Sequence, residues 1–146
     1  MKRQAIMVLS TLSLLVTLTA TSAHAQSDLR LEANIPFEFS VGKMILPAGE
    51  YTVRYGAQGV LVIQSVDRRA SQIFMTISTQ ASTPRDKSSL VFNQYGNRYF
   101  LSSIWTAGDY LGHELRKPHA EMELIRVRRG LASAWERQTV SIVAHR

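Results

Sequence analysis

The chain has no cysteine, which excludes a disulfide framework and any zinc or iron–sulfur site that depends on cysteine ligands. Several motifs are missing as well. There is no Gly-x-Ser-x-Gly nucleophile elbow, no histidine pair at the spacing of a helical metal site, and no glycine loop that leads into Lys-Ser or Lys-Thr. The sequence therefore predicts no cofactor and no metal ion, and it indicates no particular reaction.

The composition excludes several classes of protein. The 146 residues are 45% hydrophobic and 19% charged, and their mean hydropathy is −0.06. These values exclude a disordered acidic tail, a collagen-like repeat and a polytopic membrane protein. The length suits one domain and would be cramped for two.

The N-terminus has the three parts of a secretory signal peptide. Lys2 and Arg3 form a positive head. Residues 5–20 are apolar apart from Ser and Thr, and an A-x-A end follows at Ala23 and Ala25. This order predicts export and cleavage after Ala25.

We therefore expect residues 1–25 to be a signal peptide and residues 26–146 to form a single β-rich domain, located in the periplasm or secreted. The alternative is a transmembrane anchor. The apolar stretch is diluted by Ser and Thr and lacks a stop-transfer flank, which favours the signal peptide. After cleavage the chain is not expected to be an integral membrane protein.

Hydrophobic and polar residues alternate near the start of this domain. Every odd-numbered residue from Leu29 to Val41 is apolar. A period of two predicts a strand with one buried face. Pro36 cannot donate a hydrogen bond to a neighbouring strand, so we expect an edge position or a bend that splits the run into two strands.

Apolar and aromatic runs predict further strands. They cover 51–55, 60–65, 73–77 and 139–143. Within the third of these, Ile73, Met75 and Ile77 share one face and Phe74 lies on the other. We expect each strand to direct one of its two faces into a common core.

The strongest turn signal is Gly96-Asn97, which separates two apolar runs and suits a two-residue type II′ hairpin. This turn predicts that Phe92 lies opposite Leu101. Both faces of the hairpin are then apolar, so we expect it to be covered on both sides, the second by the C-terminal part. Strict alternation places Leu90, Phe92, Tyr99, Leu101 and Trp105 on one face, and Val91, Tyr95, Phe100 and Ile104 on the other.

A helix is expected near the C-terminus, with Pro118 in its first turn and Gly130 at its end. Glutamates lie early and arginines late, which complements the helix dipole. A strand is the alternative, because Met122 and Leu124 also alternate with charged residues. The stripe that would pack on the sheet comprises Ala120, Leu124, Val127 and Leu131.

These patterns together predict a mainly β fold. We expect a single antiparallel β-sandwich or partly open barrel of six to eight strands, with one C-terminal helix packed on it. A core of this size can support the fold without disulfide bonds.

Two blocks of the sequence resemble a family of small exported bacterial β-rich proteins with no known activity. The first block is Pro-Phe-Glu-Phe-Ser-Val-Gly at 36–42, followed by Leu-Pro-Ala-Gly-Glu-Tyr-Thr-Val at 46–53. The second comprises Leu-Val-Phe at 90–92, Tyr-Gly-Asn-Arg-Tyr-Phe-Leu at 95–101, and Trp105. The matching residues belong to turns and to aromatic packing positions. The resemblance therefore implies a fold and no catalytic residue.

Three sets of side chains could carry chemistry. A metal site could combine His113, His119, His145, Glu114 and Glu121. A serine triad could combine Ser102 or Ser103 with Asp109 and His113. A ligand surface could include Tyr51, Tyr55, Tyr95, Tyr99, Phe100 and Trp105. The sequence favours simpler roles: solvated histidines, hydroxyls on a sheet face, and aromatic packing between strands.

The positive charge is concentrated near the C-terminus. Residues 26–115 hold eight Lys and Arg and eight Asp and Glu, whereas residues 116–146 hold seven and three. The candidates for binding an anionic surface are Arg116, Lys117, Arg126 and Arg129. Suitable partners are anionic lipid, acidic polysaccharide or an envelope protein. Nucleic acid is not an expected partner of an exported protein. The alternative to a binding role is that these cations form a solvated helix end.

The sequence thus favours an exported, non-enzymatic module that binds another envelope or extracellular component. One alternative is a carrier that holds a small apolar ligand between sheet and helix. Another is a hydrolase with an unrecognised site. A large internal cavity would favour the carrier, and a filled core would favour the binding module.

Overall fold

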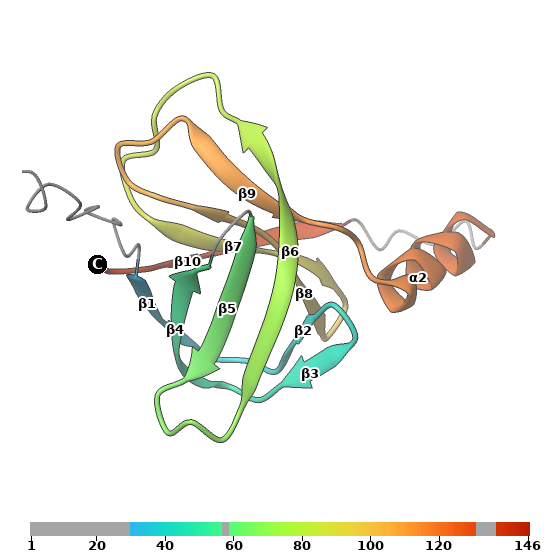
Figure 1. Ribbon diagram of the computed structural model, residues 1–146. Helices are drawn as coiled ribbons and strands as arrows, with labels where there is room; N and C mark the ends of the chain where they lie inside the picture. The colour runs from blue at the N-terminus through green and yellow to red at the C-terminus, as the bar shows by residue number, and fades with distance from the viewer. Residues whose placement is uncertain (1–29, 57–58, 131–136) are drawn as a thin grey trace, which may run out of the picture.

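The computed structural model describes residues 30–56, 59–130 and 137–146. The predicted signal peptide lies outside these residues. Ten strands and one helix, α2 (His119–Gly130), form the described part of the chain (Figure 1). In chain order the strands are β1 (Arg30–Ile35), β2 (Phe39–Val41), β3 (Met44–Leu46), β4 (Gly49–Tyr55), β5 (Val60–Ser65), β6 (Ser71–Gln80), β7 (Ser89–Tyr95), β8 (Arg98–Trp105), β9 (Leu111–Leu115) and β10 (Gln138–Val143).

The fold is mainly β with one helix, as predicted, and two of its strands were not expected from the sequence. These are β3 and β9, which raise the number above the predicted six to eight. β3 has only three residues, and Met44 and Ile45 are both exposed. β9 is interrupted by Gly112. Neither segment has the sustained alternation that identifies a half-buried strand.

The sheet curls into a partly open barrel (Figure 1). Its order is β1-β4-β5-β6-β9-β8, and β8 also pairs with β7, which pairs with β10. Just beyond β10, His145 and Glu32 of β1 exchange two backbone hydrogen bonds of 2.8 Å each. These bonds bring the two ends of the order together.

The barrel has an opening beside β6. β9 pairs with β6 only from Thr76 onward, whereas β5 pairs with residues 71–75. β2 and β3 continue the sheet from the first half of β8. Among the described residues, β6 therefore has an unpaired edge over 71–75, and β3 has one on its outer side.

The alternation predicted at the start of the domain is confirmed. Leu31, Ala33 and Ile35 of β1 are buried, and the residues between them are exposed. The run breaks around Pro36, and the chain resumes as β2, where Phe39 and Val41 are buried. Proline thus divides one alternating run into two strands in different parts of the sheet.

The predicted hairpin is confirmed near its turn and is wrong farther from it. Phe92 lies opposite Leu101, and Gly96 has the positive φ of 65° that a type II′ turn requires. A β-bulge then shifts the register between Val91 and Phe92. The extra residue exchanges the faces of the last part of β8, so Ile104 enters the core and Trp105 lies on the other side.

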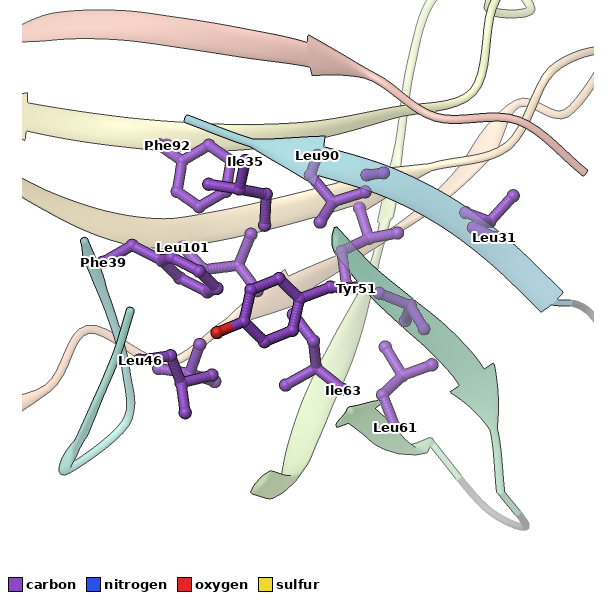
Figure 2. Packing of buried hydrophobic residues seen from close by; sticks show 14 of the residues in the cluster. Leu31, Ile35, Phe39, Leu46, Tyr51, Leu61, Ile63, Leu90, Phe92 and Leu101 are labelled. Carbon is purple, nitrogen blue, oxygen red and sulfur yellow. The ribbon is translucent and has the colours of Figure 1, made fainter. Parts of the chain in front are cut away.

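Aromatic rings from three separate strands fill the middle of the barrel (Figure 2). The ring centroid of Phe39 lies 5.2 Å from that of Tyr51 and 5.4 Å from that of Phe92, both in edge-to-face contact. The Tyr51 hydroxyl donates a hydrogen bond of 2.7 Å to the Pro47 carbonyl. The rings therefore tie β2, β4 and β7 together.

The C-terminal helix forms as predicted, but the predicted packing stripe is wrong. Ala120 and Val127 are exposed and Leu124 is only half-buried; Leu131 lies outside the described residues. Beyond its first turn, α2 projects away from the sheet (Figure 1). Within the described part of the chain, no helix is long and apolar enough to cross a membrane.

The substitution Phe92→Ala is expected to lower the free energy of unfolding by about 3–5 kcal/mol, because the ring is fully buried among other rings. Ile77→Ala serves as the control, since this side chain is 61% exposed, and should cost less than about 1 kcal/mol. Denaturant unfolding measures both. Equal losses would contradict the assignment of Phe92 to the core.

The substitution Gly112→Ala is expected to cost about 1–3 kcal/mol of stability by overpacking. A Cβ at Gly112 would lie 2.6–2.8 Å from three atoms of the Trp105 ring on the neighbouring strand. Adding Trp105→Leu should remove this clash, so the double variant should lose less than the sum of the single variants. Additive losses in denaturant unfolding would show that the ring does not restrict this position.

Candidate functional site

The structure places the predicted basic residues in and beside α2. Arg116 and Lys117 lie between β9 and the helix and are exposed. Arg126 is exposed about two turns into the helix, some 10 Å along its axis from His119. Arg129 belongs to α2, but its side chain lies outside the described part. Residues 116–130 are called the basic arm below.

A buried carboxyl group joins the base of the basic arm to the barrel. Glu121, 1% exposed, lies in the first turn of α2 and faces the outer side of β7. Its Oε1 accepts a hydrogen bond of 2.8 Å from the Asn93 amide and one of 3.0 Å from the Tyr95 hydroxyl. The Glu121 N–H donates to the Pro118 carbonyl at 3.0 Å, which forms the first turn. The arm is therefore anchored by polar contacts at its base.

The sequence did not reveal this role of Glu121, which was interpreted as a charge that complements the helix dipole. The available signal was Asn93, a polar residue within the apolar strand β7. A buried amide needs a partner, but the sequence alone does not show that this partner is 28 residues away.

The C-terminal segment was predicted to cover the outer face of the β7–β8 hairpin, and its described residues cover part of that face. The first turn of α2 covers Asn93 and Tyr95. The Arg98 guanidinium lies 5.4 Å from the centre of the Phe100 ring, and Arg85 lies 4.5 Å from that of Trp105. Cations from the same hairpin and a loop thus complete the cover.

The residues considered for a serine triad are not brought together. His113 lies 3.3 Å from the Thr76 hydroxyl and packs edge-to-face on Tyr55; burial lowers the pKa of its imidazole. Ser103 of β8 pairs with Glu114 of β9, so these two side chains lie on the same face of the sheet. His113 is the neighbour of Glu114 in β9, so its side chain lies on the opposite face. The Ser103 hydroxyl accepts a hydrogen bond from the Trp105 indole.

The third triad candidate, Asp109, accepts a hydrogen bond of 2.9 Å from the Leu111 N–H in an exposed loop. The candidate metal ligands are also dispersed. His119 lies 3.5 Å from Glu123 on the helix surface, and the Glu121 carboxylate accepts a hydrogen bond from Asn93 of β7. In residues 30–56, 59–130 and 137–146, no three His, Asp or Glu side chains gather to hold a metal ion.

The aromatic residues of the predicted ligand surface have packing roles. Tyr51, Tyr95, Phe100 and Trp105 are buried. Tyr99 stacks on Phe37 with ring centroids 3.8 Å apart. Tyr55 is half-buried and packs on His113. This confirms the interpretation of these rings as packing residues.

Among the described residues, two surface clefts lie at strand ends and turns, and neither is lined by α2. The first, about 340 Å³, lies beside the end of β10 and is lined by Lys87, Ser88, Thr106, Ala107, Val143, Ala144, His145 and Arg146. The second, about 460 Å³, is lined by residues 47–51 and 65–70. Neither corresponds to the space between sheet and helix that a carrier was expected to use.

Comparison of the chain with protein families, with curated proteins and with solved structures found no match. The resemblance of 36–53 and 90–105 to a family of small exported proteins therefore stays a prediction.

Replacing Glu121 is expected to release the basic arm. Glu121→Leu removes the acceptor for Asn93 and Tyr95 and should cost about 1–3 kcal/mol of stability. Glu121→Gln retains an acceptor oxygen and should cost less. The exposed Glu123→Leu is the matched control. Faster amide hydrogen exchange in α2 of the Glu121→Leu variant alone is the expected observation; identical exchange in all three would contradict the anchor.

Proposed function

We propose that residues 26–146 form an exported, non-catalytic binding module that attaches to an anionic surface through its basic arm. The observation that carries this proposal is the exposure of Arg116, Lys117 and Arg126 on an arm that projects from the barrel (Figure 1). Export rests on the signal-peptide pattern of residues 1–25. The partners that this charge suits are anionic lipid headgroups and acidic envelope polysaccharide.

The expected affinity is modest and depends on salt. A Lys or Arg near an anionic membrane contributes about 1 kcal/mol, and the attraction is screened beyond about 10 Å at 0.1 M salt. His119 and Glu123 pair with each other on the arm, whereas the side chains of Arg116 and Arg126 are exposed. Binding therefore requires several cations to act together.

The packing of the chain favours this function over the two alternatives. A carrier requires space between sheet and helix, but beyond its first turn the described part of α2 projects away from the barrel (Figure 1), and the rings of Phe39, Tyr51 and Phe92 occupy the middle of the core (Figure 2). For the hydrolase, the predicted nucleophile Ser103 and the predicted base His113 lie on opposite faces of the sheet. Binding through the projecting arm requires neither a space between sheet and helix nor a pair of catalytic side chains.

Replacing Arg116, Lys117 and Arg126 together by Gln is expected to reduce binding to anionic vesicles and to acidic polysaccharide by at least about tenfold at low salt, because about 1 kcal/mol is lost for each cation. Co-sedimentation and titration at several salt concentrations measure this loss. The thermal stability should stay unchanged, since all three side chains are exposed.

The matched control replaces Lys43, Arg68 and Arg69 by Gln. These three cations are exposed in the β2–β3 and β5–β6 turns, outside residues 116–130, and their removal changes the net charge equally. Equal losses in the two triple variants would indicate a general charge effect. A wild-type chain that binds neither surface at low salt would disprove the proposed function.

A further inference from the structure

A row of large apolar side chains on β6 faces outward. Ile73, Met75 and Ile77 are 64%, 76% and 61% exposed, whereas Phe74 between them is buried in the core. On β5, Val62 lies opposite Ile73 and Val60 lies opposite Met75, and both are half-buried. These five residues, called the apolar face below, form a continuous surface over two neighbouring strands.

Phe74 already occupies the core position of β6, so the outward Ile73, Met75 and Ile77 are apolar residues in addition to those of the core. β6 has no charged residue along its whole length, although charge is the common means of protecting an exposed strand. Exposed apolar residues on soluble proteins are usually scattered, and a contiguous patch marks an interaction surface.

Cations flank the apolar face on two sides. Arg54 of β4 lies opposite Val62, so Arg54, Val62 and Ile73 form one row across three strands. Gln64 accepts a hydrogen bond of 2.9 Å from the Arg54 guanidinium and holds it on this outer surface.

The second flank is the start of the basic arm. Leu115 lies opposite Thr76, and Arg116 and Lys117 follow it where the chain leaves β9 for α2. Glu114, opposite Ile77, places a negative charge at the far end of the row. The face is thus apolar in the centre and predominantly positive around it.

We propose that the apolar face and its flanking cations dock on a lipid bilayer with anionic headgroups. The inference rests on the proposed function and names the surface that the basic arm meets. Cations can bind headgroups while apolar side chains enter the boundary between headgroups and acyl chains. A hydrated polysaccharide offers the negative charge but no apolar layer, so the observed combination fits a membrane surface.

The test compares the wild-type chain with Ile73→Thr/Met75→Thr on vesicles of equal parts phosphatidylglycerol and phosphatidylcholine, on pure phosphatidylcholine vesicles and on a soluble acidic polysaccharide. The double variant is expected to lose at least about tenfold in binding to the anionic vesicles, because two apolar side chains no longer leave water. Its binding to the polysaccharide should not change. The wild-type chain should bind pure phosphatidylcholine only weakly, since the cations then lack partners.

Two further variants sharpen the comparison. Leu111→Thr/Val143→Thr removes two other exposed apolar side chains, on β9 and β10, and should leave vesicle binding unchanged. Glu114→Gln removes the negative charge beside Ile77 and should strengthen binding to anionic vesicles. Circular dichroism checks that every variant is folded, and Met75→Thr alone, at the most exposed position, replaces the double variant if that one unfolds.

The outcomes separate this inference from the function on which it rests. Equal binding of vesicles and polysaccharide, unaffected by Ile73→Thr/Met75→Thr, would overturn the membrane assignment and leave the anionic-surface function intact. A wild-type chain that binds neither would overturn both. A dimer in analytical ultracentrifugation that these substitutions dissociate, with vesicle binding unaltered, would assign the apolar face to a second copy through the open edge of β6 and would overturn the inference.

Discussion

The edge-to-face contacts among Phe39, Tyr51 and Phe92 hold together strands that are far apart in the sequence. A curled sheet has one inner surface, and its volume is limited by the strands that surround it. Once these rings occupy the centre, each remaining strand can direct only one of its two faces inward. The composition of the outer surface follows from this limit, because apolar residues on the second face have no place in the core.

The strand β6 shows the consequence. Its inward face supplies Phe74 to the core, and its outward face retains Ile73, Met75 and Ile77. Both faces carry apolar residues, so the hydrophobic effect alone does not decide which one is buried. The decision comes from the register with β5, which places Phe74 opposite the fully buried Leu61.

The attachment of α2 also leaves side chains exposed, in this case because the contact with the barrel is polar. A helix that packs by an apolar stripe lies along a sheet and hides that stripe. Glu121 instead bonds the first turn of the helix to Asn93 and Tyr95, and beyond that turn the helix extends away from the barrel (Figure 1). Apolar and basic side chains consequently remain on the outside of one molecule, which is the arrangement on which both proposals rest.

The sequence by itself determined the β-rich class, the break at Pro36, the hairpin at Gly96-Asn97 and the start of the helix, because each depends on interactions between residues close in the chain. It also located the cations of the basic arm. Only the tertiary structure decided which side of β6 is outside, that a bulge exchanges Ile104 and Trp105, and that Glu121 is an anchor. These features depend on contacts between distant strands, and a local pattern of alternation defines two faces without specifying the neighbour that covers either one.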